Sequence, residues 1–161
     1  MKKIGFLINP VAGIGGRVGL KGSDGRHIQE EAKRLGAVAE APARALAALK
    51  RAEGIQEDIL FLVAPDIMGE RIISQTSFRY EVIGKINGEK TTAEDTIRIA
   101  KDMEKAGAEL LFFAGGDGTA RNVCEALGKN LPVIGIPAGV KIHSAVYAYN
   151  SKNAGEALKS F

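Results

Sequence analysis

The chain has 161 residues, enough for one domain with a sizeable core, and its 45% hydrophobic and 25% charged residues are typical of a soluble globular protein. A net charge of +3 mildly favours anionic ligands but is too small to indicate nucleic acid, and no apolar segment approaches membrane-spanning length. The single cysteine excludes an internal disulfide and a cysteine-cluster metal site. We therefore expect a cytoplasmic protein without nucleic-acid or membrane partners.

The first third of the chain predicts a strand, a glycine-rich loop and two helices. Residues 3–8 form an apolar run that predicts a buried strand, and Asn9-Pro10 ends it. A loop over 11–25 follows. Apolar spacing then predicts helices over 26–35 and 42–53, each followed by a glycine.

The loop after the first strand carries six glycines and two basic residues. A phosphate or ribose cradle that includes Gly13, Gly15 and Gly16 is the sharper interpretation, and a mobile loop is the alternative. Val18 stands where the dinucleotide fingerprint needs a third glycine. The order Lys-Gly-Ser over 21–23 transposes the end of a Walker A loop, so the loop fits neither of these motifs.

The middle of the chain predicts two strands and two helices. Residues 58–64 read as a strand, 68–75 as a short helix and 78–83 as a weaker strand at an edge. Thr91-x-x-Glu94 is a capping-box pattern that predicts the start of a helix ending at Gly107. Its expected apolar stripe is Ala93, Ile97, Ala100 and Met103.

The last third contains the most distinctive stretch. A strand is predicted over 109–114, then the turn Gly-Gly-Asp-Gly-Thr at 115–119, then a helix whose core stripe is Ala120, Val123, Cys124 and Leu127. A strand over 132–136 follows. We expect a short helix after residue 139, with Ile142, Ala145, Val146 and Tyr149 facing inward, and a helix over 153–161.

Strands that alternate with helices, each a continuous apolar run, predict a three-layer α/β/α fold with a mostly parallel sheet. We expect residues 1–161 to form one nucleotide-binding domain. Ligands of such sheets bind at the carboxyl ends of the strands. The unusual loops at 9–25, 65–66, 115–119 and 137–144 all fall there.

The turn at 115–119 has a chemical use. The first turn of a helix offers unpaired backbone N–H groups and partial positive charge, which suit a phosphate. Asp117 would repel that phosphate unless a cation or a hydroxyl proton lies between them, and phosphoryl transfer supplies both. The alternative is that Asp117 is only a helix N-cap and the glycines only a turn.

The string at 115–119 resembles the signature of the NAD kinase, diacylglycerol kinase and phosphofructokinase-like superfamily. The wider string over 113–123 is similar to the predicted ATP- or polyphosphate-dependent NAD kinases, which are related to the AcoX proteins of acetoin gene clusters. Asn9-Pro10 with its glycine cluster and the string over 136–144 resemble the same branch.

This resemblance implies transfer of a phosphoryl group from ATP or polyphosphate to the 2′-hydroxyl of NAD, with Mg²⁺ neutralising charge. Asp117 would be the catalytic base or orienting acceptor. The expected nucleotide contacts are Asn9, Gly13, Gly15, Gly16, Gly115, Gly116, Gly118, Thr119, Lys141 and Ser144. No protein metal ligand is assigned. His143 is either a proton shuttle or ribose contact, or an ordinary loop histidine.

The resemblance also implies a homo-oligomer and a second, β-rich domain that this chain does not include. Asn122 departs from the aspartate expected at that position, which would weaken a metal site that used it. Two other functions stay open. One is a lipid kinase of the diacylglycerol or sphingosine type, which should show an exposed apolar entrance. The other is a non-catalytic nucleotide-binding module or acetoin-operon accessory protein.

Overall fold

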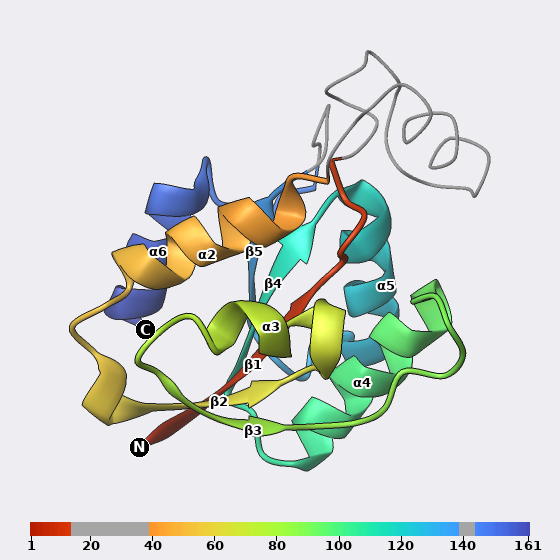
Figure 1. Cartoon of the computed structure of the whole chain (residues 1–161), viewed down its shortest axis with the longest axis horizontal. Helices are drawn as coiled ribbons and strands as arrows, with labels where there is room; N and C mark the ends of the chain where they lie inside the picture. Colours follow the sequence, from red (N-terminus) through yellow and green to blue (C-terminus); the bar gives the residue numbers. More distant parts are fainter. Residues whose placement is uncertain (14–38, 139–143) are drawn as a thin grey trace.

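The computed structural model describes residues 1–13, 39–138 and 144–161, and its centre is one sheet of five parallel strands (Figure 1). The strands lie in the order β3-β2-β1-β4-β5, so the predicted parallel sheet is confirmed and the third strand is an edge strand as expected. Their bounds are β1 (Lys2–Ile8), β2 (Ile59–Val63), β3 (Arg79–Val82), β4 (Leu110–Gly115) and β5 (Val133–Pro137).

Helices cover both faces of this sheet, which confirms the three-layer α/β/α fold. On one face lie α2 (Ala41–Arg51), α6 (Ser151–Ser160) and the short α3 (Glu70–Ile73). On the other lie α4 (Ala93–Lys105) and α5 (Asp117–Leu127) (Figure 1). Two short 3₁₀ turns, η2 (Gln56–Asp58) and η3 (Asp66–Met68), flank β2. The helix predicted over 26–35 lies outside the described residues.

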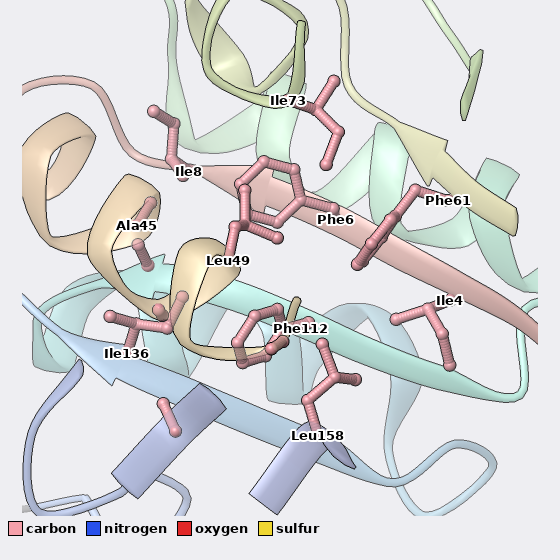
Figure 2. Packing of buried hydrophobic residues seen from close by; sticks show 14 of the residues in the cluster. Ile4, Phe6, Ile8, Ala45, Leu49, Phe61, Ile73, Phe112, Ile136 and Leu158 are labelled. Carbon is pink, nitrogen blue, oxygen red and sulfur yellow. The ribbon is translucent and has the colours of Figure 1, made fainter. Parts of the chain in front are cut away.

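The core on the α2 and α6 side is built around aromatic rings of neighbouring strands (Figure 2). Phe6 of β1 lies 5.9 Å from the ring of Phe61 and 6.3 Å from that of Phe112, centroid to centroid. Phe6 and Phe112 are also register partners in the sheet, whereas Leu7 and Phe113 face the α4 and α5 layer. Both faces of the central strands are therefore buried, which explains why β1, β2 and β4 read as unbroken apolar runs.

The strand order reverses between β1 and β4. Strands that follow β1 in the chain lie on both sides of it, and α2, the next described helix after β1, lies on the opposite face from α5, which follows β4. Such a switch point opens a crevice at the carboxyl ends of the strands, where ligands bind in open α/β sheets. The Asn9 N–H donates to the Ala114 carbonyl over 2.9 Å, which holds the ends of the two central strands together.

The capping box at the start of α4 lies one residue later than predicted. Thr92 is the N-cap and accepts from the Asp95 N–H, while the Asp95 carboxylate accepts from the Thr92 N–H. Adjacent threonines and adjacent acids made both registers possible in sequence. Asp95, and not Glu94, completes the capping box because its carboxylate also accepts from the Asn87 N–H and pairs with Arg98.

This shift changes the inward face of α4. The buried residues are Asp95, Thr96, Ile99, Ala100 and Met103, so Ala100 and Met103 lie in the core as predicted. Ala93 is exposed and Ile97 only partly buried, which corrects the predicted stripe. Among the described residues, no helix has the length and apolar character needed to span a membrane.

Candidate functional site

The turn at 115–119 joins the last residue of β4 to the first turn of α5, which confirms the predicted strand–turn–helix order. α5 begins at Asp117, so Gly118 and Thr119 also lie in its first turn. Gly116 is the N-cap, and no side chain caps this end. The interpretation of Asp117 as a simple N-cap is therefore wrong, and backbone N–H groups of the first turn point out of the helix at its positive end.

Gly115 is required by packing inside the turn. A Cβ atom at this position would lie 2.3 Å from Thr119 Oγ1 and 2.5 Å from Thr119 Cβ, inside the van der Waals radii of both. Gly115, Gly116 and Gly118 do not adopt positive φ, so backbone conformation does not require glycine at these positions. The glycine at 115 instead lets the buried Thr119 side chain fold back against the end of β4.

Asn9 fastens the end of β1 to this turn. Its Nδ2 donates to Thr119 Oγ1 over 3.2 Å, and its Oδ1 accepts from the Val11 N–H over 3.2 Å. Asn9 thus stabilises its own turn, as asparagine commonly does. Its side chain also brings the loops after β1 and β4 together, while a nucleotide contact by Asn9 stays a prediction.

Gly13 marks the close approach of two loops. Its φ is +84°, a conformation that side chains rarely adopt, and a Cβ there would lie 2.0 Å from the Ala138 carbonyl oxygen. Ala138 in turn donates its N–H to the Gly115 carbonyl over 3.0 Å. The loops after β1, β4 and β5 therefore meet at one place. The predicted contacts Gly15, Gly16 and Lys141, and also His143, lie outside the described residues.

Asp117 and Ser144, predicted from distant parts of the chain, meet at this edge. The Ser144 N–H donates to Asp117 Oδ1 over 3.0 Å. The two residues line a hollow of about 370 Å³ together with Ala120, Arg121 and Cys124. A carboxylate, a guanidinium group and a serine therefore surround one space at the positive end of α5. That combination suits a phosphorylated ligand whose hydroxyl faces the carboxylate.

Tyr147 is a site residue that the sequence analysis missed. Its hydroxyl donates to the Gly116 carbonyl and its ring lies 5.4 Å from that of Phe113. Burial raises the pKa of Tyr147, and the negative charge of Asp117 adds to the effect, so the hydroxyl keeps its proton. A neutral donor on the Gly116 carbonyl holds the N-cap of α5 in place.

One sequence signal could have indicated Tyr147. Gly135 stands inside β5, where glycine is unfavourable unless something packs closely. A Cβ at Gly135 would lie 2.5 Å from Tyr147 Cδ1. The helix expected after residue 139 is wrong within 144–150, where the chain forms a turn and a bridge from Tyr147 to Gly135. Tyr149, expected to face inward, is 89% exposed.

Cys124 is exposed, which corrects its predicted place in the core. Because α5 begins at Asp117, its buried stripe is Thr119, Ala120, Val123 and Leu127. Cys124 lies beside this stripe at the border of the hollow next to Asp117. The described residues contain no cluster of three or more histidine, cysteine or acidic side chains arranged for a metal ion.

Comparison with known proteins was made by family models and by curated sequences. The model of the ATP-NAD kinase N-terminal domain matches residues 4–161, nearly the whole chain. The search of curated proteins found no match.

Proposed function

We propose that this chain, which belongs to the ATP-NAD kinase N-terminal domain family, binds the nucleotides of an NAD kinase reaction at the turn formed by residues 115–119. Membership makes it a nucleotide-binding domain of the NAD kinase type, with ATP and NAD as the substrates that the family implies. The observation that carries the proposal is the position of Asp117. It is the first residue of α5, and its carboxylate accepts a hydrogen bond from the Ser144 N–H.

In the proposed reaction, the 2′-hydroxyl oxygen of the NAD adenosine ribose attacks the γ-phosphorus of ATP. A new P–O bond forms, the bond between that phosphorus and the bridging oxygen breaks, and ADP leaves. Asp117 accepts the hydroxyl proton as the oxygen becomes more acidic in the transition state. The product is NADP. With polyphosphate as donor, the terminal phosphoryl group is transferred in the same way and the shortened polyphosphate leaves.

The groups around Asp117 suit the charge of this reaction. Backbone N–H groups of Gly118 and Thr119 lie in the first turn of α5, where they can donate to phosphate oxygens. Arg121 lines the same hollow one helical turn after Asp117 and brings positive charge to it. Gly116 and Ser144 complete the proposed phosphate contacts, together with the predicted Lys141.

The donor set also fits a magnesium ion carried by the substrate phosphates. Mg²⁺ in phosphoryl-transfer sites is typically held by one or two carboxylates plus phosphate oxygens. Asp117 is the carboxylate that lines the hollow. When bound, Mg²⁺ would neutralise charge on the transferred phosphoryl group. Within the family, the string over 113–123 supports a place near the ATP- or polyphosphate-dependent, AcoX-related branch.

Titration calorimetry tests the nucleotide site. ATP, ADP, NAD and NADP are titrated into the chain with and without Mg²⁺, and into a Gly116→Val variant. Saturable binding that the variant loses is expected, because Gly116 is the N-cap of α5 and its carbonyl is held by Tyr147. Failure of all four nucleotides to bind the unaltered chain would reject the proposal.

Turnover tests the role of Asp117. Asp117→Asn keeps the shape of the side chain but removes the proton acceptor, so NADP formation from ATP and NAD should fall by roughly a hundredfold or more. Asp58→Asn, an exposed aspartate in η2 beside the start of β2, is the matched control and should retain activity. Circular dichroism checks that both variants fold. Full activity in Asp117→Asn would remove Asp117 from the mechanism.

A further inference from the structure

We propose that a second hollow, beside the turn at 115–119, binds the adenosine moiety of a substrate nucleotide; this inference rests on the proposed function. The hollow has a volume of about 600 Å³ and lies at the carboxyl end of β1. Ile8, at the end of this strand, lines it and is labelled in Figure 2. Among the predicted nucleotide contacts that lie within the described residues, none lines this hollow, so it adds a distinct part to the site.

The apolar part of the lining comes from three parts of the chain. Ile8 is the last residue of β1 and Pro10 and Val11 follow it, Pro42 lies at the start of α2, and Ile67 and Ile72 lie in η3 and α3. Volumes of roughly 300–1,000 Å³ with apolar walls are typical of small-molecule sites. A nucleobase has two large apolar faces, so walls of isoleucine, valine and proline suit it.

The rim carries the polar groups that a nucleoside needs. Arg71, Glu89, Lys90, Thr91 and Thr92 line the hollow. Lys90 is exposed and makes no hydrogen bond or ion pair with the described residues, so its ammonium group can approach a phosphate or a ribose hydroxyl. An acyl chain would gain nothing from these groups, whereas a nucleotide uses both the walls and the rim.

The end of β1 links this hollow to the turn at 115–119. Ile8 is the register partner of Ala114, the residue before Gly115. The next residue, Asn9, donates its N–H to Ala114 and its side chain to Thr119. Pro10 and Val11 therefore follow directly from the residue that touches the turn. A nucleotide with its base against these two residues can direct its phosphates to the positive end of α5.

The test separates the base from the phosphates. Adenosine, tripolyphosphate, ATP and NAD are titrated into the chain and into Ile72→Trp, whose indole ring occupies part of the hollow. Adenosine binding should weaken by roughly tenfold or more, because the base is excluded from its apolar walls, and tripolyphosphate binding should be unchanged. If the substitution weakens the binding of ATP but not of NAD, the hollow holds the adenosine of the phosphoryl donor. If it weakens the binding of NAD but not of ATP, the hollow holds the adenosine of the acceptor.

Two controls keep the result interpretable. Ile97→Trp makes the same change at a partly buried isoleucine of α4, on the other face of the sheet, and should bind all four ligands normally. If Ile72→Trp does not fold, Ile72→Gln replaces it, since a polar side chain of similar length removes the apolar wall without filling the space. Circular dichroism reports on folding in each case.

Four outcomes overturn the inference. One is normal adenosine, ATP and NAD binding in the folded Ile72 variants. Another is binding of phospholipid vesicles, lost in Ile72→Trp, in the absence of adenosine binding. The third is tripolyphosphate binding without any adenosine binding, which rejects the hollow and keeps the phosphate site. The last is absence of all binding, which rejects both. Adenosine binding without tripolyphosphate binding would keep the hollow and reject the proposed phosphate site.

Discussion

Replacing Asp95 with asparagine should destabilise the fold and loosen the rim of the proposed adenosine site. The Asp95 carboxylate is 1% exposed and accepts from the N–H groups of Thr92 and Asn87 at 3.0 and 3.2 Å. It also pairs with Arg98 over 2.7 Å. These contacts tie both ends of the segment over 87–92 to the first turn of α4. Four residues of that segment, 89–92, line the apolar hollow.

The expected loss of stability follows from the hydrogen bonds that an asparagine side chain cannot accept. Oδ2 of Asp95 accepts from Thr92 while Oδ1 accepts from Asn87 and Arg98, and an amide keeps only one of these two oxygens. Hydrogen bonds to a charged group contribute about 1.5–3 kcal/mol each. Arg98 is 35% exposed, which weakens its part, so we expect a loss of about 2 kcal/mol. For a domain of this size that lowers Tm by roughly 4–8 °C.

The pH dependence of this loss identifies its cause. Burial of the Asp95 carboxyl acts to raise its pKa, but the hydrogen bonds from Arg98, Asn87 and Thr92 outweigh it and hold the pKa below its ordinary value. A carboxyl with a lowered folded-state pKa stabilises the fold above its unfolded pKa, near 3.9, and loses this contribution as the pH falls through the folded value. The difference between Asp95→Asn and the unaltered chain should therefore be constant near neutrality and shrink below about pH 4.

The assay is urea unfolding of both chains over a series of pH values, with Glu94→Gln as control. Glu94 is the exposed neighbour first expected in the capping box, and its substitution should change stability by less than about 0.5 kcal/mol. A stability difference that persists unchanged to about pH 3 would show that amide geometry, not charge, is responsible, and would refute the reasoning. Adenosine should also bind more weakly to Asp95→Asn than to the unaltered chain in a titration.

Two further predictions concern the support of the turn. Gly135→Ala should destabilise the fold by about 1–3 kcal/mol in urea unfolding, because the new methyl group would lie 2.5 Å from Tyr147 Cδ1. The double variant with Tyr147→Ala should be less than additive, and additivity would show that the two residues do not compete for the space. Tyr147→Phe removes the donor to the Gly116 carbonyl and should cost about 1 kcal/mol of stability. Weaker tripolyphosphate binding should accompany that loss, and unchanged binding would exclude a role for this hydrogen bond in shaping the turn.

Features set by local sequence could be predicted well. The central strands β1, β2 and β4 read as apolar runs because both of their faces are buried. Gly115 to Thr119 form the expected turn because the strand before and the helix after are both strongly patterned. Asp117 and Ser144 were both proposed as site residues, and the structure joins them over 3.0 Å. That contact follows from the rule that loops at the carboxyl ends of parallel strands meet.

Features that depend on competition between neighbouring residues could not be predicted from the sequence. Thr91 and Thr92 offer the same capping chemistry, and the choice between them depends on Arg98, which the local pattern does not include. Tyr147 and Tyr149 are equally suited to burial, and the space above Gly135 selects Tyr147. The apolar hollow beside Ile72 is assembled from segments far apart in sequence, and no local pattern indicates that these segments come together.

The place of β1 at the centre of the sheet has a consequence for synthesis of the protein. β1 leaves the ribosome before the other strands of the sheet, yet one of its two neighbours is β4, with Ile4 paired to Leu110 more than a hundred residues later. The apolar strand β1 must therefore wait, with one backbone edge unpaired, until β4 has been made. Such distant pairing slows folding and leaves nascent chains prone to aggregate. Slowing of translation before residue 110 should thus lower the yield of native protein more than slowing after it.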